Sequence, residues 1–368
     1  MQGYYNAMVY AGSSMLVGAV GLMYWGVSGI LTVILVGLIN GYSHIIEMEA
    51  FRMSDAVEIW ERPTATQIHM LVGWRQWADA GSISSGLPKY LIEQTQARKI
   101  GIIRSDGFYL FQFPGTHGLM RPIIKFEEGH PKSLETKRNE LYYTGNDQRG
   151  VVILLGDEPH LDIERYTEAV LHIIKSLGIK RTVGLGGVYG ELPYDKERTV
   201  SCVYSLPPMK EELSALAVNF SDYEGGASIG SYICQRAGQQ AIEYANLYAF
   251  VPIFNLADLT QSGSTIHIEN DFSAWLGIMR RVNHLLKTGF DLSDLRQKHE
   301  QLKNSIDAKV EELESASPEL ELRKYFAGLS ESYDEKSFDP LDEIWKKELG
   351  SLLDDLDPDE SASQSSEE

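Results

Sequence analysis

The sequence predicts an α/β fold, in which a mostly parallel sheet is flanked by helices and followed by a C-terminal helical extension. Short apolar runs alternate with helical patterns along the middle of the chain, and the pattern after Phe272 is helical throughout. Continuous apolar strands separated by amphipathic helices are typical of parallel sheets buried on both faces. The 368 residues are 43% hydrophobic and 23% charged, a composition that excludes a wholly disordered, collagenous or disulfide-stapled protein.

The first strand and helix are predicted where the charged part of the chain begins. Residues 67–72 form a short apolar run that enters Gly73. Residues 82–96 then carry apolar side chains at helical spacing. An apolar run, a glycine and an amphipathic segment together predict a strand, a turn and a helix.

A second strand and helix repeat this order. Residues 150–155 are apolar and lead into Gly156, and residues 162–177 follow with apolar side chains on one helical face. Glycine is the common residue after a helix, because it adopts a left-handed backbone without steric cost. The second helix is therefore expected to end at Gly178.

Two further strands are expected at residues 182–183 and 247–251. The glycines after the first of them miss the dinucleotide-binding pattern, since Tyr189 stands where its third glycine is needed, and they are interpreted as a turn. Near the end of the chain, leucines and other apolar residues recur at three-, four- and seven-residue spacings, a stripe that either docks on the sheet domain or pairs with another subunit as a coiled coil. The turn glycines are Gly184, Gly186, Gly187 and Gly190, and the stripe consists of Leu292, Leu295, Leu302, Ile306, Val310 and Leu313.

The charge balance argues against nucleic acid as a partner. The chain has 33 basic and 52 acidic residues and a formal net charge of -19, which repels a phosphate backbone. From residue 301 to the end there are 20 acidic and 7 basic residues, so most of the excess lies in the last part of the chain. Residues 351–368 have almost nothing to bury and are expected to be a disordered acidic tail.

The N-terminal segment contrasts with the acidic tail, because it is uncharged and apolar. Residues 1–46 contain no charged side chain, and the apolar run at 15–39 is long enough for a helix to cross about 30 Å of hydrocarbon. No Lys or Arg flanks that run on its N-terminal side, and the first charges after it are Glu47 and Glu49, so the usual orientation signal is absent. Two explanations stay open: a membrane anchor, or a mis-set start with the natural one at Met48 or Met53. Two cysteines in so long a chain suit a reducing compartment, so the expected location is cytoplasmic, with an N-terminal membrane anchor as the alternative.

Candidate ligand-binding residues follow the predicted strands. Ligands of open parallel sheets bind at the carboxyl ends of the strands. Asp79 and Glu158 follow two strands at equivalent points, and Glu224 precedes a later helix. Carboxylates that share a crevice favour a cation or an amine, and at least one of them has a raised pKa. The alternative is structural: Asp79 would cap the helix that begins near Ser82, as Asp162 would cap the next one.

Ser228 is a candidate nucleophile, because residues 226–230 match the G-x-S-x-G elbow. Asp258 and a downstream histidine would complete the triad, and a helix is expected over 229–245. The residues before Ser228 are typical of a loop, whereas the elbow needs a strand, so a helix N-terminus packed on the sheet is favoured. His160 is the one histidine singled out. The nine histidines form no HxxxH or HExxH motif, and we predict neither a metal site nor a cofactor.

Five short motifs occur in order along the chain. The same motifs, at similar spacing, occur in the proteasome assembly chaperone family, and the chain resembles its bacterial and archaeal members over about residues 55–295. Residues 310–325 are similar to the helical extension that many prokaryotic members carry, and members begin near Met53, which favours a mis-set start. The motifs are Gly73-Trp74 with Asp79-Ala80-Gly81, Leu154 through His160, Leu185-Gly186-Gly187 with Pro193, Tyr223-Glu224-Gly225, and Val251-Pro252.

The resemblance implies an α/β sandwich similar to nucleoside phosphorylases and hydrolases, an oligomeric habit and, in eukaryotes, help in assembling the α-ring of the proteasome core particle. Archaeal relatives that dock on proteasomes use a C-terminal hydrophobic-Tyr-X motif, whereas this chain ends Ser366-Glu367-Glu368. It also departs at residues 194–196, where relatives have His-Thr-Arg, and at 226–228, where they have Pro-Thr-Gly. The resemblance therefore does not predict docking by the C-terminal route, and any pocket formed at those positions would take a different ligand.

The expected function is that of a non-catalytic assembly or scaffold factor that binds other proteins, with proteasome subunits as candidate partners, and that forms a homo-oligomer. The alternative is a small-molecule-binding protein or an enzyme of hydrolase or ligase type that uses an acidic crevice at the strand ends. The expected parts are an apolar N-terminal segment (1–47), a proteasome-assembly-chaperone-like α/β domain (54–290), a helical extension (291–350) and the acidic tail (351–368). The candidate crevice residues are Gly73, Trp74, Asp79, Gly81, Gly156, Glu158, His160, Gly186, Gly187, Glu191, Tyr223, Glu224 and Ser228.

Overall fold

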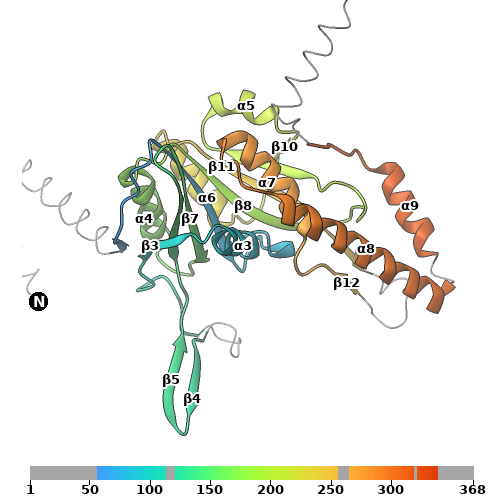
Figure 1. The fold of residues 1–368 in the computed structure, drawn as a ribbon, viewed down its shortest axis with the longest axis horizontal. Helices are drawn as coiled ribbons and strands as arrows, with labels where there is room; N and C mark the ends of the chain where they lie inside the picture. The colour runs from blue at the N-terminus through green and yellow to red at the C-terminus, as the bar shows by residue number, and fades with distance from the viewer. Residues whose placement is uncertain (1–55, 113–120, 256–264, 319–320, 339–368) are drawn as a thin grey trace, which may run out of the picture. The chain divides into compact units, whose positions relative to one another are not determined.

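The structure of the protein is a computed structural model (Figure 1). The chain divides into two units, Met1–Glu58 and Ile59–Glu368. The second unit holds almost all of the residues that the structure describes, and the helices and strands below belong to it, except for Val57 and Glu58 of the first strand. The described residues are 56–112, 121–255, 265–318 and 321–338.

Four sequence predictions fall outside these ranges. They are the apolar run at 15–39, the two possible start sites, the acidic tail at 351–368 and the candidate triad residue Asp258. Within the described ranges, no helix is both long enough and apolar enough to cross a membrane.

Four parallel strands form the centre of the sheet, in the order β7, β2, β8 and β11. Antiparallel pairing extends it on both sides, to β6 and β3 beyond β7 and to β9 beyond β11. The predicted mostly parallel α/β sheet is therefore confirmed. The central strands are β7 (Arg149–Asp157), β2 (Gln67–Arg75), β8 (Arg181–Gly190) and β11 (Tyr244–Asn255); the others are β1 (Val57–Ile59), β3 (Arg98–Ile103), β6 (Glu140–Gly145), β9 (Val200–Tyr204), β10 (Asn219–Phe220) and β12 (Thr265–His267).

Helices cover both faces of this sheet, which is why its central strands are continuous apolar runs. Side chains alternate between the faces of a strand, and two neighbours in β2 show the result. A Cβ on Gly73 would lie 1.9 Å from the carbonyl oxygen of Ser84, just before α3. Trp74 points to the other face, where it bonds Tyr166 of α4. The helices are η1 (Ala80–Ser82), α3 (Gly86–Gln94), α4 (Ile163–Ser176), η2 (Pro207–Met209), α5 (Lys210–Ser214), α6 (Ile229–Gln239), α7 (Phe272–Leu286), α8 (Ser293–Ala316) and α9 (Leu322–Ser332).

Three details of the sequence prediction are wrong. Asp162 precedes α4, but its side chain makes no capping hydrogen bond and pairs with Arg165 at 2.6 Å instead. The glycines expected to form a turn lie inside β8, which continues to Gly190. They are glycines because neighbours pack where a Cβ would be: one on Gly184 would lie 1.8 Å from Oδ1 of Asn246, and one on Gly186 would lie 2.3 Å from the Tyr248 ring. The helix expected over 229–245 ends at Gln239, because β11 begins at Tyr244.

The antiparallel strands and a separate hairpin were not anticipated. The hairpin consists of β4 (Ile123–Glu127) and β5 (His130–Glu135), and it extends away from the main sheet (Figure 1). Glu128 and Gly129 connect its strands with positive φ angles of 49° and 83°. Two adjacent residues with positive φ are typical of a two-residue hairpin turn.

The helices after the sheet pack on the domain. Leu295, Ile306 and Val310 of the apolar stripe are buried in the same core cluster as α7. In α9, the ring of Phe326 lies 5.1 Å from that of Tyr194 and 4.8 Å from that of Phe254. Of the two roles that the sequence left open for the stripe, the described structure shows docking on the chain's own sheet domain.

Candidate functional site

Asp79 lies at the carboxyl end of β2, in the loop that leads to α3. Its Oδ1 accepts hydrogen bonds from the backbone amides of Ser84 and Ser85, each at 2.9 Å. Its backbone pairs with Gly187 of β8. Burial raises the pKa of Asp79, against the effect of these hydrogen bonds. The carboxylate therefore holds the turn before α3, whose N-cap is Ser85, and it makes no capping bond to the helix expected near Ser82.

Glu158 and Ser228 meet at the start of α6. Oε1 of Glu158 accepts a hydrogen bond of 2.8 Å from the amide of Ile229, the first residue of the helix. Oγ of Ser228 accepts a bond of 3.2 Å from the amide of Ser231 and lies 2.8 Å from the Tyr248 hydroxyl. Burial raises the pKa of Glu158. Ser228 is thus the N-cap of α6, as expected for the structural alternative to the nucleophile elbow, and a loop precedes it.

Trp74 and Gly156 belong to a buried polar network behind the strand ends. The indole Nε1 of Trp74 donates to the Tyr166 hydroxyl at 2.8 Å, and the Tyr166 and Tyr109 hydroxyls each lie 2.9 Å from Oδ1 of Asn139. A Cβ on Gly156 would lie 2.6 Å from the same Asn139 oxygen. These residues form a closed structural network rather than the lining of an open crevice.

Asp157 is a buried carboxylate that sequence analysis missed. Its side chain is 7% exposed and pairs with Arg75 at 3.4 Å and with Lys137 at 3.3 Å. It also accepts a bond of 2.8 Å from the Arg138 amide. His160, three residues further on, accepts a bond of 3.3 Å at Nδ1 from the Leu110 amide, and burial lowers its pKa. Both side chains hold neighbouring loops against the end of β7.

The remaining candidates lie apart from Asp79 and Glu158. Glu191 accepts a hydrogen bond of 2.7 Å from the Tyr325 hydroxyl of α9. Tyr223 is 71% exposed, and Glu224 is exposed beside it. Asp79 and Glu158 therefore lie in loops at the same sheet edge, whereas Glu191 holds the extension and Glu224 faces solvent.

Gly81 and Gly187 let the β2–η1 loop lie against its neighbours. Gly81 has a φ of +60°, and its carbonyl accepts a bond of 2.9 Å from Nε1 of Trp275. A Cβ on Gly187 would lie 2.1 Å from the carbonyl oxygen of Ala80. Because Gly81 and Gly187 have no Cβ, the backbones can pack this closely.

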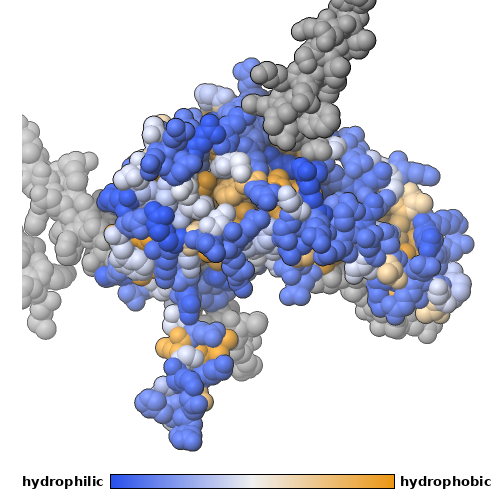
Figure 2. Space-filling view, viewed as in Figure 1, coloured by the Kyte–Doolittle hydropathy of each residue, from blue (hydrophilic) through white to orange (hydrophobic). Residues whose placement is uncertain are grey.

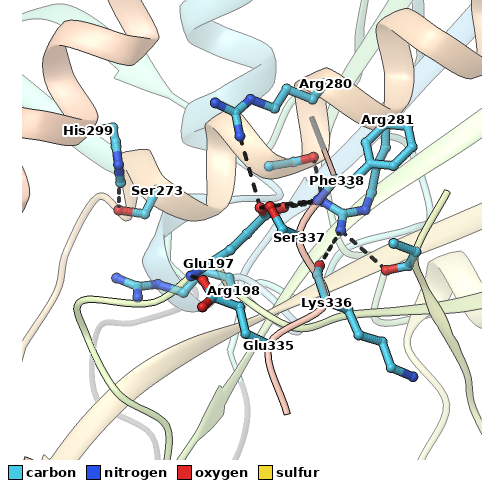
Figure 3. Close-up of polar contacts among 12 residues, drawn as sticks. Glu197, Arg198, Ser273, Arg280, Arg281, His299, Glu335, Lys336, Ser337 and Phe338 are labelled. Atoms are coloured by element: carbon cyan, nitrogen blue, oxygen red, sulfur yellow. Dashed lines mark hydrogen bonds and ion pairs between the residues drawn. The ribbon is translucent and has the colours of Figure 1, made fainter. Parts of the chain in front are cut away.

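Glu197 holds the end of the described chain against α7 (Figure 3), and sequence analysis did not find it. Residues 333–338, which we call the C-terminal strap, contact it through Ser337 and Phe338. The Glu197 carboxylate accepts bonds from the Ser337 hydroxyl at 2.9 Å and the Phe338 amide at 3.2 Å, and lies 3.1 Å from Nη1 of Arg281. These partners are up to 141 residues from Glu197, so no local motif marks the cluster.

Two fully buried arginines support this edge of the domain. Arg281 donates from Nε to the carbonyl of Leu216 at 2.9 Å, and burial lowers its pKa. Arg198 pairs with Asp271 at 2.8 Å, and the two side chains are 1% and 0% exposed. Asp271 also caps α7, because its Oδ1 accepts bonds from the Ser273 and Ala274 amides. The Arg281–Glu197 and Arg198–Asp271 pairs hold backbone segments in place and do not face a cavity.

Metal-ligand clusters and cysteine thiols are two features that would suggest catalysis. No three His, Cys, Asp or Glu side chains there are grouped to hold a metal ion. Cys202 and Cys234 are buried free thiols, and burial raises the pKa of each to about 12. A thiol with so high a pKa is a poor nucleophile at neutral pH.

The β4–β5 hairpin presents apolar side chains to solvent. Ile124 pairs with Leu134 and Phe126 with Pro131 across the two strands. Ile124, Phe126 and Leu134 are 46%, 59% and 57% exposed. Figure 2 shows the resulting apolar patch on the hairpin, with hydrophilic residues at its tip. Exposed apolar patches of this kind commonly mark a protein-binding surface.

Solved structures of similar fold include proteins of actinobacteria. A proteasome-assembly chaperone homologue of Mycobacterium tuberculosis is 20% identical, with a TM-score of 0.56 over 66% of this chain and 94% of that one. A PAC2 family protein of Streptomyces avermitilis is 20% identical, with a TM-score of 0.55 over 66% and 95% of the two chains. A second M. tuberculosis protein, of unknown function, is 20% identical, with a TM-score of 0.58 over 81% and 92%. At this identity the likeness shows the fold alone.

The family is established by the sequence itself. No curated protein matches the chain. The model of the PAC2 family matches residues 74–310, a stretch that includes the central strands from the end of β2 onward and most of α8. Since that stretch is more than half of the 368 residues, the chain belongs to the PAC2 family.

Proposed function

We propose that this protein is a non-catalytic assembly factor of the proteasome-assembly-chaperone type, which acts by binding other proteins. The observation that carries the proposal is the β4–β5 hairpin, whose large apolar side chains are exposed on a two-stranded sheet. An isolated hairpin is only marginally stable in water, so a partner that covers Ile124, Phe126 and Leu134 would stabilise it. The M. tuberculosis relative described as a proteasome-assembly chaperone homologue supports the same function.

The carboxylates at the strand ends also favour this function over catalysis. Asp79 and Glu158 each accept hydrogen bonds from amides at or before a helix start. A general acid or base needs its carboxylate within reach of a substrate proton. Here one oxygen of each carboxylate, Oδ1 of Asp79 and Oε1 of Glu158, holds backbone amides.

The proposed partners are proteasome α-subunits. Residues 121–138, which include the hairpin, carry five basic and three acidic side chains in a chain of net charge -19. The hairpin can therefore approach an acidic protein surface that the rest of the chain would repel. We also propose a homo-oligomer in the cytoplasm, with membrane attachment only if residues 15–39 form a real span.

Complex formation with purified α-subunits tests the proposal. The full chain is mixed with proteasome α-subunits of the source organism, and the mass of the eluting species is measured by size-exclusion chromatography with light scattering. We expect a complex that is lost when Phe126→Ser and Leu134→Ser are combined. Leu161→Ser is the matched control, because Leu161 is 41% exposed on a different loop. If the wild type forms no complex, the proposed function is wrong. If the complex forms equally well with the hairpin substitutions, the hairpin is not the surface that binds the α-subunits.

A small-molecule site in the predicted crevice is the second candidate. It is favoured by one observation, that burial raises the pKa of both Asp79 and Glu158, as in many active sites. The combined change Asp79→Asn and Glu158→Gln removes both charges and keeps an acceptor oxygen at each position. Loss of ligand binding with α-subunit binding intact would favour the crevice, and unchanged behaviour in both assays would count against it.

A further inference from the structure

A cavity lies at the opposite end of the sheet from the predicted crevice. Its volume is about 240 Å³, and it lies where β2 and β7 begin, next to the end of α3 and the α7–α8 loop. This is smaller than the roughly 300–1,000 Å³ typical of pockets for drug-sized ligands, so a small metabolite would fill it. The residues that line it are His69, Thr95, Thr144, Gly145, Arg149, Gly150, Val151, Leu286, Thr288, Gly289, Phe290 and Asp291.

Arg149 supplies the positive charge of this cavity. Its Nη1 donates to the carbonyl oxygen of Lys287 at 2.9 Å, which holds the α7–α8 loop beside the sheet. No carboxylate of the described residues forms an ion pair with it. A guanidinium has five N–H donors in a planar fork, so Arg149 keeps donors that can bind a carboxylate with two parallel hydrogen bonds.

Asp291 supplies a negative charge in the same lining. Its Oδ1 accepts bonds from the amide and hydroxyl of Ser293, at 2.9 and 2.5 Å. Those bonds lower its pKa, so the side chain is ionised at neutral pH. Like Arg149, it has no ion-pair partner among the described residues. One cation and one anion, both unpaired, therefore line one small cavity.

His69 adds a buried polar atom that lacks a partner. Among the described residues, nothing hydrogen bonds its Nδ1. Burial and the nearby Arg181 lower the pKa of His69, so the ring is neutral at neutral pH. The Nδ1 atom itself is enclosed by protein atoms, so His69 contributes a neutral ring to the wall of the cavity and not a contact to a ligand.

The threonines add acceptors. The hydroxyls of Thr95 and Thr288 donate to Leu91 and Asn283, both at 2.7 Å. Each hydroxyl has thus given its one proton to the protein, and its oxygen lone pairs can only accept. Phe290 and Leu286 supply apolar walls. The lining therefore offers a donor fork at one position, several acceptors at others, and apolar surface between them.

We propose that this cavity binds a small zwitterion of the α-amino acid type, with its carboxylate on Arg149 and its ammonium group on Asp291 and the threonine oxygens. The lining carries one charge of each sign, so a ligand with one charge of each sign matches it. A phosphate or a dicarboxylate would face Asp291 without compensation. The site is independent of the proposed assembly function, and its failure would leave that function untouched.

Calorimetric titration of the full chain with each common L-amino acid tests the proposal. We expect at least one to bind with one-to-one stoichiometry, and its N-acetyl and carboxamide derivatives, which each lack one charge, to bind at least about tenfold more weakly. Arg149→Gln and Asp291→Asn should each weaken binding by a similar factor. Both side chains are exposed, and Asn keeps the acceptor for Ser293, so both variants should fold, as thermal melting would verify.

Arg165→Gln is the matched control, because Arg165 is paired with Asp162 at the start of α4, away from the cavity. It should leave the affinity unchanged. The proposal is overturned if no amino acid binds the wild type, if neither cavity variant weakens binding, or if the derivatives bind as well as the parent amino acid.

Discussion

Asp79 and Glu158 are the residues for which sequence and structure can be compared most closely. The spacing of Asp79 to the following helix is a local signal, and the structure places its carboxylate on the amides of Ser84 and Ser85 just before α3, rather than at the helix start expected near Ser82. Glu158 contacts the start of a helix 71 residues away. No local spacing could predict that contact, because it depends on how β7 and α6 pack in three dimensions.

The raised pKa values of these two carboxyl groups predict a pH effect on stability. A carboxyl group whose pKa is higher in the folded than in the unfolded chain binds more protons when folded, so its contribution to stability falls as pH rises through that interval. The interval begins at the ordinary values of 3.8 and 4.5 for the two groups.

We therefore expect the free energy of unfolding of the wild type, relative to the Asp79→Asn, Glu158→Gln variant, to decrease as pH rises from about 4 toward neutrality. Urea unfolding of both proteins over a pH series measures the difference. A difference that increases with pH would mean that hydrogen bonds to the ionised carboxylates outweigh their burial.

The Arg198–Asp271 pair predicts a large loss of stability. Arg198→Met leaves Asp271 as a buried charge without its partner, and breaking a buried pair in this way costs about 3–5 kcal/mol. Chemical denaturation measures the change. Arg98→Met is the control, because Arg98 pairs with Glu61 where both side chains are about half exposed, and little change is expected there. Equal losses in the two variants would refute the assignment of this energy to burial.

At the scale of elements, the parallel strands were predictable and the antiparallel ones were not. Residues of β2 and β7 are buried on both faces and read as continuous apolar runs. In β6, buried and half-buried residues alternate over only six positions, which is a weak signal in a single sequence. The strands of the hairpin have no buried face at all, so hydrophobic periodicity could not reveal them.

The glycines of β8 show a second reason why the sequence prediction was wrong. Glycine is frequent in turns, and a cluster of four is reasonably interpreted as one. Their actual cause lies in other elements, since the side chains of Asn246 and Tyr248 on β11 occupy the space beside Gly184 and Gly186. Such contacts are visible only when the neighbouring strand is known.

The C-terminal strap predicts a local change in dynamics. Glu197→Ala removes the acceptor of the Phe338 amide and the Ser337 hydroxyl, and it leaves the buried Arg281 without a carboxylate. We expect amides of residues 333–338 to exchange with solvent faster in this variant, while those of α4 on the other sheet face stay unchanged. Hydrogen exchange with mass spectrometry measures both regions.

Ser337→Ala is the matched control for the strap, since it removes only the one hydroxyl bond. A small effect from this variant beside a large one from Glu197→Ala is the expected order. If strap exchange is the same in Glu197→Ala and the wild type, the strap is held by its other contacts, such as that of the Phe338 ring with Arg281.

At the scale of the whole molecule, the resemblance drawn from five short motifs is confirmed by the family match over residues 74–310. The fold class follows from the same middle part of the chain. The predicted domain limits stay predictions, and the structure adds that α8 and α9 belong to the same unit as the sheet. The proposed binding surface could not be predicted from the sequence, because the hairpin has neither a catalytic motif nor a hydrophobic period.

The rate of proteasome assembly tests the central claim most directly. Purified α- and β-subunits of the source organism are mixed with and without the full chain, and formation of the core particle is followed by native electrophoresis and peptidase activity. The account predicts faster or more complete assembly with the wild type, and no acceleration with the Phe126→Ser, Leu134→Ser variant. Assembly that proceeds at the same rate with and without the wild-type chain would contradict it.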